Sequence, residues 1–289
     1  MATKREKDEI SGTETTGHDW DGIRELDTPL PRWWLWTFYA TIVWALGYVI
    51  LMPAVPLVDS YTPGVLGYAS RASIETQVAE AAQAQQVYLD RIAASSLQQI
   101  ADDPELAAFA QAGGRSAFAV NCAPCHGSGA AGAKGYPNLN DDDWLWGGSL
   151  DAIETTLRFG IRAPHADTRN NVMAAFLRDG ILTSAQVNDV AEYVLSLSGR
   201  PHDGEAATRG QAVFAEQCVA CHQQGGVGSK ELGAPNLADN VWLYGGSKAA
   251  IVETVSYGRG GVMPAWEGRL SPTTLKLLAV YVHELGGGE

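Results

Sequence analysis

The sequence predicts a mostly α-helical protein, with a single N-terminal transmembrane helix followed by two tandem domains of similar size. Two observations predict this fold class. An uncharged, largely apolar run extends from Trp33 to Val58, and such a run is typical of a membrane-spanning helix. Residues 113–199 and 205–289 repeat the same motifs in the same order, which indicates an internal duplication. The segment between the run and the first repeat is then a connecting arm.

The composition limits the classes of function. The chain has 289 residues, of which 46% are hydrophobic, and a formal net charge of −13. This length allows about two domains. A nucleic-acid-binding protein needs a basic surface, so we expect no nucleic-acid partner. An acidic surface favours a basic protein partner instead.

The uncharged run has the length of a transmembrane helix. Trp33 to Met52 is a stretch of 20 residues, about 30 Å of helix, which matches the hydrocarbon thickness of a bilayer. Pro53 and Pro56 are expected to stop the helix. The alternatives are a buried core helix and a cleaved signal peptide, but a signal peptide has a shorter apolar region behind a short basic leader. We assign residues 33–58 to an uncleaved transmembrane anchor.

The distribution of basic residues predicts the orientation of this anchor. Five basic residues precede the run, whereas only Arg71 is basic within 15 residues after it. Because basic flanks stay on the cytoplasmic side, residues 1–32 are predicted to be a cytoplasmic N-terminal segment and the chain after Val58 to lie outside. The basic residues of the leader are Lys4, Arg5, Lys7, Arg24 and Arg32.

Residues 59–112 are predicted to form a helical connecting arm. Apolar residues recur at helical spacing through residues 72–101, among polar ones. The sequence Asp102-Asp103-Pro104 is typical of a helix end followed by the cap and first-turn proline of the next helix. We expect the arm to be a spacer that packs on a neighbour.

The two repeats, the predicted first domain (113–199) and second domain (205–289), share two motifs. The C-x-x-C-H sequence at 122–126 matches the one at 218–222, at an offset of 96 residues. The Pro-Asn-Leu segments further along the repeats match at an offset of 98 residues. Each repeat is predicted to close with a helix that begins with a capping residue, Thr183 in the first and Ser271 in the second.

The C-x-x-C-H motif predicts covalently attached haem c. On a helix with 100° per residue, the two sulfurs and the imidazole lie on one face. The thiols can therefore bond to the vinyl groups of one porphyrin while the imidazole reaches its iron. A single zinc site would have to unite both repeats, and a thioredoxin-like redox pair needs no following histidine. We predict two covalently bound haem c groups. The thioether residues are Cys122, Cys125, Cys218 and Cys221, and the proximal iron ligands are His126 and His222.

Two methionines at equivalent repeat positions are the predicted distal iron ligands. Met173 belongs to the first repeat and Met263 to the second, whereas Met52 lies in the anchor. A gap-filling core role is the alternative for a methionine. The first repeat also carries an insertion, residues 161–171, in which His165 is an alternative sixth ligand. An iron with histidine and methionine on its two faces has no open position for a substrate, so these domains should carry single electrons.

Both repeats resemble class I cytochromes c. The resemblance rests on the C-x-x-C-H motif, the Pro-Asn-Leu segment and the downstream methionine, which occur in this order in each repeat. It implies two tandem class I cytochrome c domains. It also implies that the carbonyl groups of Pro137 and Pro235 accept a hydrogen bond from the proximal imidazoles, which fixes the orientation of the rings.

The leader resembles that of a particular diheme cytochrome. Residues 21–34, Asp-Gly-Ile-Arg-Glu-Leu-Asp-Thr-Pro-Leu-Pro-Arg-Trp-Trp, are similar to the leader of the diheme subunit (CcoP or FixP) of cbb3-type cytochrome c oxidases, apart from Thr28, where asparagine is usual. The resemblance implies a subunit that takes electrons from a soluble or membrane-bound cytochrome c. It would pass them to the monohaem subunit and then to the haem–copper catalytic subunit, where oxygen is reduced to water and protons are pumped.

The same resemblance implies a location and a role within a complex. The chain would be anchored once in the bacterial inner (cytoplasmic) membrane, with both haem domains in the periplasm. It would have no catalytic residues and would belong to an enzyme only as a subunit of the oxidase. A diheme peroxidase would need an open iron site. The alternative is a diheme electron-acceptor subunit of a periplasmic dehydrogenase.

Overall fold

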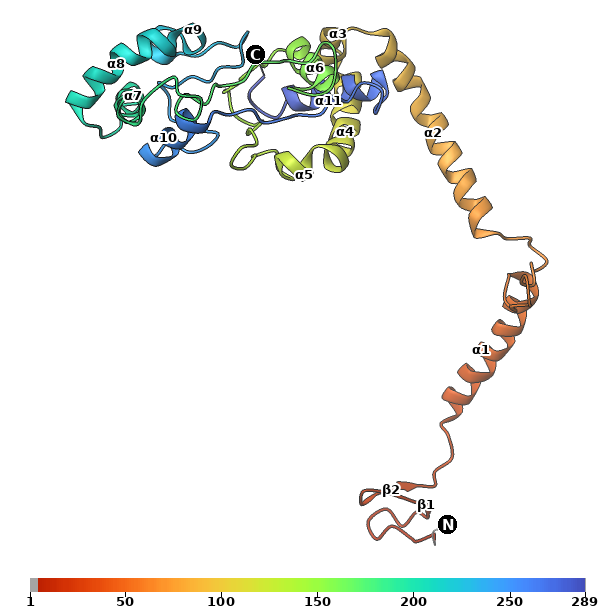
Figure 1. Cartoon of the computed structure of the whole chain (residues 1–289). Helices are drawn as coiled ribbons and strands as arrows, with labels where there is room; N and C mark the ends of the chain where they lie inside the picture. Colours follow the sequence, from red (N-terminus) through yellow and green to blue (C-terminus); the bar gives the residue numbers. More distant parts are fainter. Residues whose placement is uncertain (1–4, 289) are drawn as a thin grey trace. The chain divides into compact units, whose positions relative to one another are not determined.

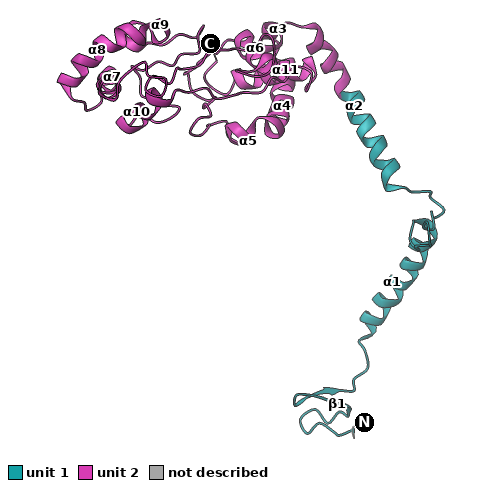
Figure 2. Cartoon of the chain, viewed as in Figure 1, with its two compact units in different colours: residues 1–84 teal, residues 85–289 magenta. Residues whose placement is uncertain are grey.

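The computed structural model describes residues 5–288, and its helices and strands are shown in Figure 1. Residues 1–4 and 289 lie outside the described residues; they include Lys4 of the basic leader and the last residue of the predicted second domain. The chain consists of two compact units, residues 1–84 and 85–289 (Figure 2).

The first unit begins with a β-hairpin that the sequence analysis did not predict. Strands β1 (Thr15–Trp20) and β2 (Ile23–Leu26) pair antiparallel, with Trp20 opposite Ile23. The two residues between them, Asp21 and Gly22, have φ angles of 53° and 90°. Two residues of positive φ are the mark of a tight type I′ turn, and Asp-Gly is a preferred sequence for it.

Helix α1 (Arg32–Leu51) lies within one residue of the predicted transmembrane helix. It buries none of its residues against the rest of the described chain, and it is long and apolar enough to cross a membrane. The remainder of the predicted anchor, residues 53–58, is not helical. The chain turns back there, and the N–H groups of Val65 and Leu66 donate to the carbonyls of Ile50 and Leu51, both at 3.0 Å. The loop thus satisfies carbonyls that a helix end leaves free.

The connecting arm is helical as predicted, but the helical region predicted over residues 72–101 is broken after Ala94. It forms α2 (Ser70–Ala94) and α3 (Leu97–Asp102), and the predicted next helix is α4 (Pro104–Asn121). Asp103 caps α4 as predicted, since its carboxylate accepts the backbone N–H groups of Glu105 and Leu106 at 2.9 and 3.2 Å. The end of the arm belongs to the second unit, where Ile92 and Ile100 are fully buried.

The remaining helices of the second unit follow the predicted order of the repeats. The capping box at Thr183 and the cap at Ser271 are both confirmed. The first repeat contains α5 (Ala123–His126), α6 (Leu150–Phe159) and α7 (Ser184–Leu197). The second contains α8 (Gly204–Gln217), α9 (Val219–His222), a 3₁₀ turn at Gln224–Gly226, α10 (Lys248–Tyr257) and α11 (Pro272–His283).

The two hydrophobic cores of this unit do not follow the repeat boundaries. The first core joins α3, α4 and α6 to α11, the last helix of the second repeat. The second core joins α8 and α10 to α7, the last helix of the first repeat. In Figure 1, α11 accordingly lies beside α4 and α6, and α7 beside α8. The predicted domain boundaries at 199 and 205 therefore do not separate the two cores, because the closing helices are exchanged.

Two equivalent glycines show how closely the exchanged helices approach. Gly114 in α4 and Gly210 in α8 are 96 residues apart, like the C-x-x-C-H motifs. A Cβ atom at Gly114 would overlap the carbonyl of Leu277 in α11, and one at Gly210 would overlap the carbonyl of Asp189 in α7. Both cores thus use the same glycine-dependent helix crossing, each with a partner helix from the other repeat.

Candidate functional site

Each C-x-x-C-H motif forms one short helical turn at the end of a longer helix. Helix α4 ends before Cys122, whose carbonyl accepts the N–H groups of Cys125 and His126 at 3.1 and 2.9 Å. Cys218 plays the same part after α8, for Cys221 and His222, at the same two distances. The turn places the two thiols and the imidazole of each motif on one side. Burial raises the pKa of Cys122 and that of Cys218 to about 11.

The histidine of each motif lies within hydrogen-bond distance of a prolyl carbonyl. Nδ1 of His126 lies 3.1 Å from the oxygen of Pro137, and Nδ1 of His222 lies 3.0 Å from that of Pro235. Because a carbonyl only accepts, each Nδ1 must carry the proton. Burial lowers the pKa of both imidazoles, against the smaller opposing effect of this hydrogen bond. Each ring is therefore kept neutral, with the lone pair of Nε2 free to bind a metal.

A cavity of about 720 Å³ lies against the second motif. Cys218, His222 and Pro235 line it, together with Met173 of the first repeat. The loop after the first motif contributes residues 136–138. The volume and the largely apolar lining are typical of a cofactor site.

One residue that lines this cavity has a buried polar atom that could pair with an acidic group. Trp242 lines the cavity, and within the described residues its indole Nε1 is buried with no hydrogen-bond partner. An unpaired buried N–H group costs about 1–3 kcal/mol, so a bound acceptor would stabilise it. The propionate groups of a haem are such acceptors. The thiol of Cys218, the imidazole of His222 and this unpaired N–H group therefore fit a haem, which would supply one-electron redox chemistry at this site.

The other two predicted ligands, Met263 and His165, lie in different surroundings. Met263 packs on the first core, which includes Cys122. His165, the alternative ligand, lies elsewhere: its Nε2 is 3.3 Å from the carboxylate of Glu267, and its ring centroid is 5.0 Å from that of Phe159. The contact with Glu267 occupies Nε2 of His165 and does not favour iron ligation by this residue.

Two arginines that the sequence pattern does not single out occupy equivalent places beside the two cores. Arg169 lies over the ring of Trp146 and donates to Thr156 at 2.9 Å. Arg259 lies over the ring of Tyr244 and donates to Thr254 at 3.0 Å. The aromatic and threonine positions match at the repeat offset of 98 residues, but the arginines are 90 residues apart in sequence because the first belongs to the insertion.

The loops that follow the two motifs pack against each other. The N–H of Gly135 donates to the carbonyl of Leu243 at 2.9 Å, and the side chain of Asn171 donates to the carbonyl of Leu232 at 2.7 Å. Trp146 covers Gly233 so closely that a side chain there would overlap its ring. The two sites are therefore neighbours within one folded unit.

A carboxyl group at this junction provides a pH test. Partial burial, with the negative charges of Asp239 and Asp141, raises the pKa of Asp143 to about 6. Since this is above its ordinary value of 3.8, the carboxyl group ionises first in the unfolded chain. The folded state therefore loses stability as the pH rises from 3.8 to about 6, and the loss stays complete above pH 6. We expect Asp143→Asn to be more stable than the wild type at pH 7.5, and this advantage to vanish below pH 4. Chemical denaturation at both pH values measures it; an advantage independent of pH would contradict the assignment.

Three parts of the chain match families of known proteins. Residues 12–59 match the family described as the N-terminal domain of cytochrome oxidase-cbb3, FixP. Residues 111–198 match the cytochrome c family, and residues 205–282 match the family of cytochrome c oxidase, cbb3-type, subunit III.

Similar proteins match the chain over nearly its whole length. The cbb3-type cytochrome c oxidase subunit FixP of Bradyrhizobium diazoefficiens is 55% identical over 290 residues, covering 100% of both chains. FixP of Azorhizobium caulinodans is 54% identical, over 98% of this chain and 96% of its own. The subunit CcoP of Cereibacter sphaeroides is 49% identical, over 100% of both chains.

Proposed function

Because the chain belongs to the family of FixP and CcoP subunits of cbb3-type cytochrome c oxidases, we propose that it takes electrons from a basic cytochrome c. We further propose that it delivers them to the monohaem subunit, and through it to the haem–copper subunit. As a member of the family, the chain is an electron-relay subunit of the oxidase, with covalently bound haem c in its cytochrome c domains. The observation that carries the proposal is the match over the full length, including the leader.

The side chains of the two cores hold the haem groups in this proposal. Cys122 and Cys125 form the thioethers of the first haem, and Cys218 and Cys221 those of the second. His126 and His222 are proximal iron ligands, Met173 and Met263 are distal ligands, and the carbonyls of Pro137 and Pro235 orient the imidazoles. An iron with both axial positions filled exchanges single electrons and offers no position for oxygen. Oxygen reduction therefore belongs to another subunit.

The N-terminal part anchors the chain in the membrane, and we propose the bacterial inner membrane with the leader in the cytoplasm. The excess of Lys and Arg before α1 supports this orientation. The haem-binding unit would then lie in the periplasm. Between Trp33 and Leu51 the helix contains no acidic, basic or histidine residue. A proton pathway needs such groups within the membrane, so we place proton pumping in the partner subunits.

Co-purification tests the proposal. The full-length chain is tagged at its C-terminus and purified from detergent-solubilised membranes, and the metals and haem types of the complex are measured. The proposal predicts that copper and b-type haem accompany the chain. Purification with a dehydrogenase that carries a flavin or quinone cofactor, and without copper, would contradict it. The match of residues 12–59 to the oxidase leader does not favour that alternative.

The acidic charge predicts how the donor binds. From Asp59 onward the chain has 15 Lys and Arg against 25 Asp and Glu, a net charge of −10. Salt screens the attraction, since the Debye length falls from about 10 Å at 0.1 M to about 3 Å at 1 M. We expect kcat/KM for oxidation of a lysine-rich cytochrome c to fall at least about tenfold over this range. Steady-state oxidation kinetics measure it, and a rate independent of ionic strength would contradict electrostatic docking.

A further inference from the structure

We propose that Trp146 and Tyr244 are positioning residues, each of which holds in place the loop that orients the motif histidine of the other repeat. Trp146 acts on the loop of Pro235, whose carbonyl lies 3.0 Å from Nδ1 of His222, and Tyr244 acts on the equivalent loop of the first repeat. The inference rests on the proposed function in one respect, namely that both histidines ligate haem iron. It goes beyond that function because it couples the two haem sites through a protein contact.

The aromatic residues and the loops occupy equivalent positions in the two repeats. Trp146 and Tyr244 are 98 residues apart in the sequence, and so are the glycines at 135 and 233. Both glycines have a positive φ angle, 87° at Gly135 and 63° at Gly233. Each lies two residues before the proline whose carbonyl faces the imidazole. The same arrangement at both sites argues against a chance contact.

Each aromatic ring contacts the glycine of the other repeat. The ring of Trp146 covers Gly233 so closely that a Cβ atom there would overlap it. A Cβ atom at Gly135 would lie 3.4 Å from Cε1 of Tyr244, which is ordinary van der Waals contact. The N–H of Gly135 also donates to the carbonyl of Leu243 at 2.9 Å. The two rings therefore meet the loops just before each proline.

An arginine of the same repeat holds each ring. Cζ of Arg169 lies 5.2 Å from the ring centroid of Trp146, and its Nε donates to Thr156 of α6 at 2.9 Å. Cζ of Arg259 lies 4.5 Å from the ring centroid of Tyr244, and its Nε donates in the same way to α10, at 3.0 Å. A cation over an aromatic face is attracted to it. Each ring is thus tied to a helix of its own repeat.

Trp146 reaches the second site through the loop. Gly233 and Pro235 line the cavity at the second motif, but Trp146 is not among the described residues that line it. The carbonyl of Leu232, next to Gly233, accepts a hydrogen bond from the side chain of Asn171 at 2.7 Å. The first repeat therefore holds this loop at two adjacent residues, and an effect of Trp146 on the second haem would pass through it.

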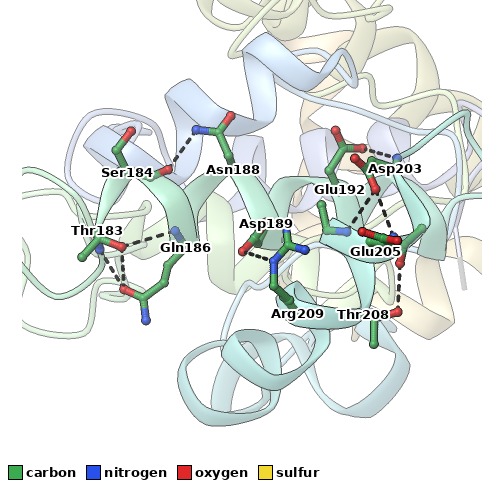
Figure 3. Close-up of polar contacts among 12 residues, drawn as sticks. Thr183, Ser184, Gln186, Asn188, Asp189, Glu192, Asp203, Glu205, Thr208 and Arg209 are labelled. Carbon is green, nitrogen blue, oxygen red and sulfur yellow. Dashed lines mark hydrogen bonds and ion pairs between the residues drawn. The ribbon is translucent and has the colours of Figure 1, made fainter.

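Other contacts fix the helix before the second motif. Arg209 of α8 donates two hydrogen bonds to Asp189 of α7, at 2.8 and 3.0 Å (Figure 3). The carboxylate of Glu192 in α7 accepts the N–H of Asp203, the residue before α8, at 3.0 Å. These contacts hold α8, and with it the turn that carries His222, without the aid of the loop. Loss of Trp146 should therefore loosen the prolyl carbonyl and leave the imidazole in place.

A loosened carbonyl should change the midpoint potential in a defined direction. The hydrogen bond from Nδ1–H to the carbonyl makes an imidazole a stronger electron donor, and a stronger donor favours ferric iron. Without Trp146, the carbonyl of Pro235 is held less firmly, so the potential of the second haem should rise. Entry of water, the other result of losing a large side chain, would favour ferric iron and lower the potential.

Marking one haem spectroscopically tests the proposal in the full-length complex. Cys218→Ala leaves the second haem with one thioether, and the vinyl group that this haem retains shifts its α-band to longer wavelength. A redox titration then follows the two haems separately. Trp146→Ala should raise the midpoint potential of the marked haem and leave the unmarked haem unchanged. Trp146→Tyr, which supplies the ring that the second repeat has at this position, should keep the potential of the marked haem unchanged.

The reciprocal experiment marks the first haem with Cys122→Ala. In this background Tyr244→Ala should raise the midpoint potential of the first haem, because the loop of Pro137 loses its contact. Tyr244→Phe keeps the ring and should leave this potential unchanged. A first haem that does not respond to Tyr244→Ala would contradict the reciprocal half of the proposal.

Other outcomes of the Trp146→Ala titration overturn the proposal. A shift of the unmarked haem, alone or with the marked one, would make Trp146 a packing residue of its own repeat. An unchanged or lowered potential of the marked haem would exclude an effect through the prolyl carbonyl. A wild-type chain without covalent haem would instead refute the proposed function.

A second variant tests the same contact if Trp146→Ala does not bind two haems. Gly233→Ala adds a methyl group that overlaps the ring of Trp146, so it should displace the loop and raise the potential of the marked haem alone. Gly180→Ala is the matched control, because Gly180 has a similar φ of 71° and its Cβ would meet nothing within 4 Å. It should shift neither haem, and a response equal to that of Gly233→Ala would contradict the proposal.

Discussion

Replacing Gly114 with alanine is expected to destabilise the haem-binding unit strongly, whereas replacing its neighbour Gly113 should not. The added methyl group at Gly114 would overlap backbone atoms of Leu277 and Cβ of Tyr281 in α11. Backbone cannot yield as a side chain can, so we expect a loss of about 3 kcal/mol or more in the free energy of unfolding, at or above the upper end of the usual cost of overpacking. Chemical denaturation followed by far-ultraviolet circular dichroism measures it.

The neighbouring glycine is a matched control in the same helix. A Cβ at Gly113 would approach Cδ1 of Leu277 at 3.0 Å, the flexible end of a side chain. Alanine also favours a helix over glycine by up to about 1 kcal/mol, so Gly113→Ala should be close to neutral. Equal stability of the two variants would mean that α11 does not cross α4 at Gly114, and the exchange of closing helices would be wrong.

Removing both thiols of one motif is expected to have the largest effect on function. In the double variant Cys218→Ser with Cys221→Ser, the second haem has no covalent attachment. The cavity of about 720 Å³ then no longer retains this haem. We expect one haem per chain in place of two, and oxidation of cytochrome c by the complex to fall to background. Haem content after denaturation and steady-state oxidation kinetics measure these two results.

A single substitution distinguishes the loss of covalent haem attachment from the loss of one thiol. Cys218→Ala alone leaves Cys221 to form one thioether, so this variant should retain two covalent haems and most of the activity. If the double variant kept full activity, electron transfer would not need the second site, and the relay through both haems would be contradicted.

Much of the candidate site could be predicted because its signals are local. The C-x-x-C-H turns, the caps at Asp103, Thr183 and Ser271, and the length of α1 depend on neighbouring residues, and the structure contains each of these elements. Pro137 and Pro235 were implied by the resemblance to cytochromes c, and their carbonyls lie within hydrogen-bond distance of the two imidazoles.

The exchange of α7 and α11 was not predicted because the repeats are alike. Either arrangement pairs a closing helix of similar apolar face with a glycine-containing helix, so the periodicity of the sequence does not distinguish them. The connections do. Only residues 198–203 separate α7 from α8, and such a short connection favours antiparallel packing of the two helices it joins. The insertion at 161–171 was a second signal. It lengthens the connection from α6, in the first core, to α7, in the second core.

Two smaller features were missed for different reasons. The hairpin at 15–26 lies in a polar leader without a clear alternating pattern, but Asp21-Gly22 was a turn signal. The match between Arg169 and Arg259 depends on the path of the insertion, which returns Arg169 to the backbone of Gly160 through a hydrogen bond of 3.2 Å. A contact made by the return of a loop has no fixed spacing in the sequence.

The mass of the intact, acid-denatured chain tests the central claim most directly. Acid removes haem that is held only by iron ligands, whereas thioether bonds survive it. The account predicts the mass of the polypeptide plus two haem groups, with no cysteine free to react with an alkylating reagent. The mass of the polypeptide alone, with four reactive thiols, would contradict it.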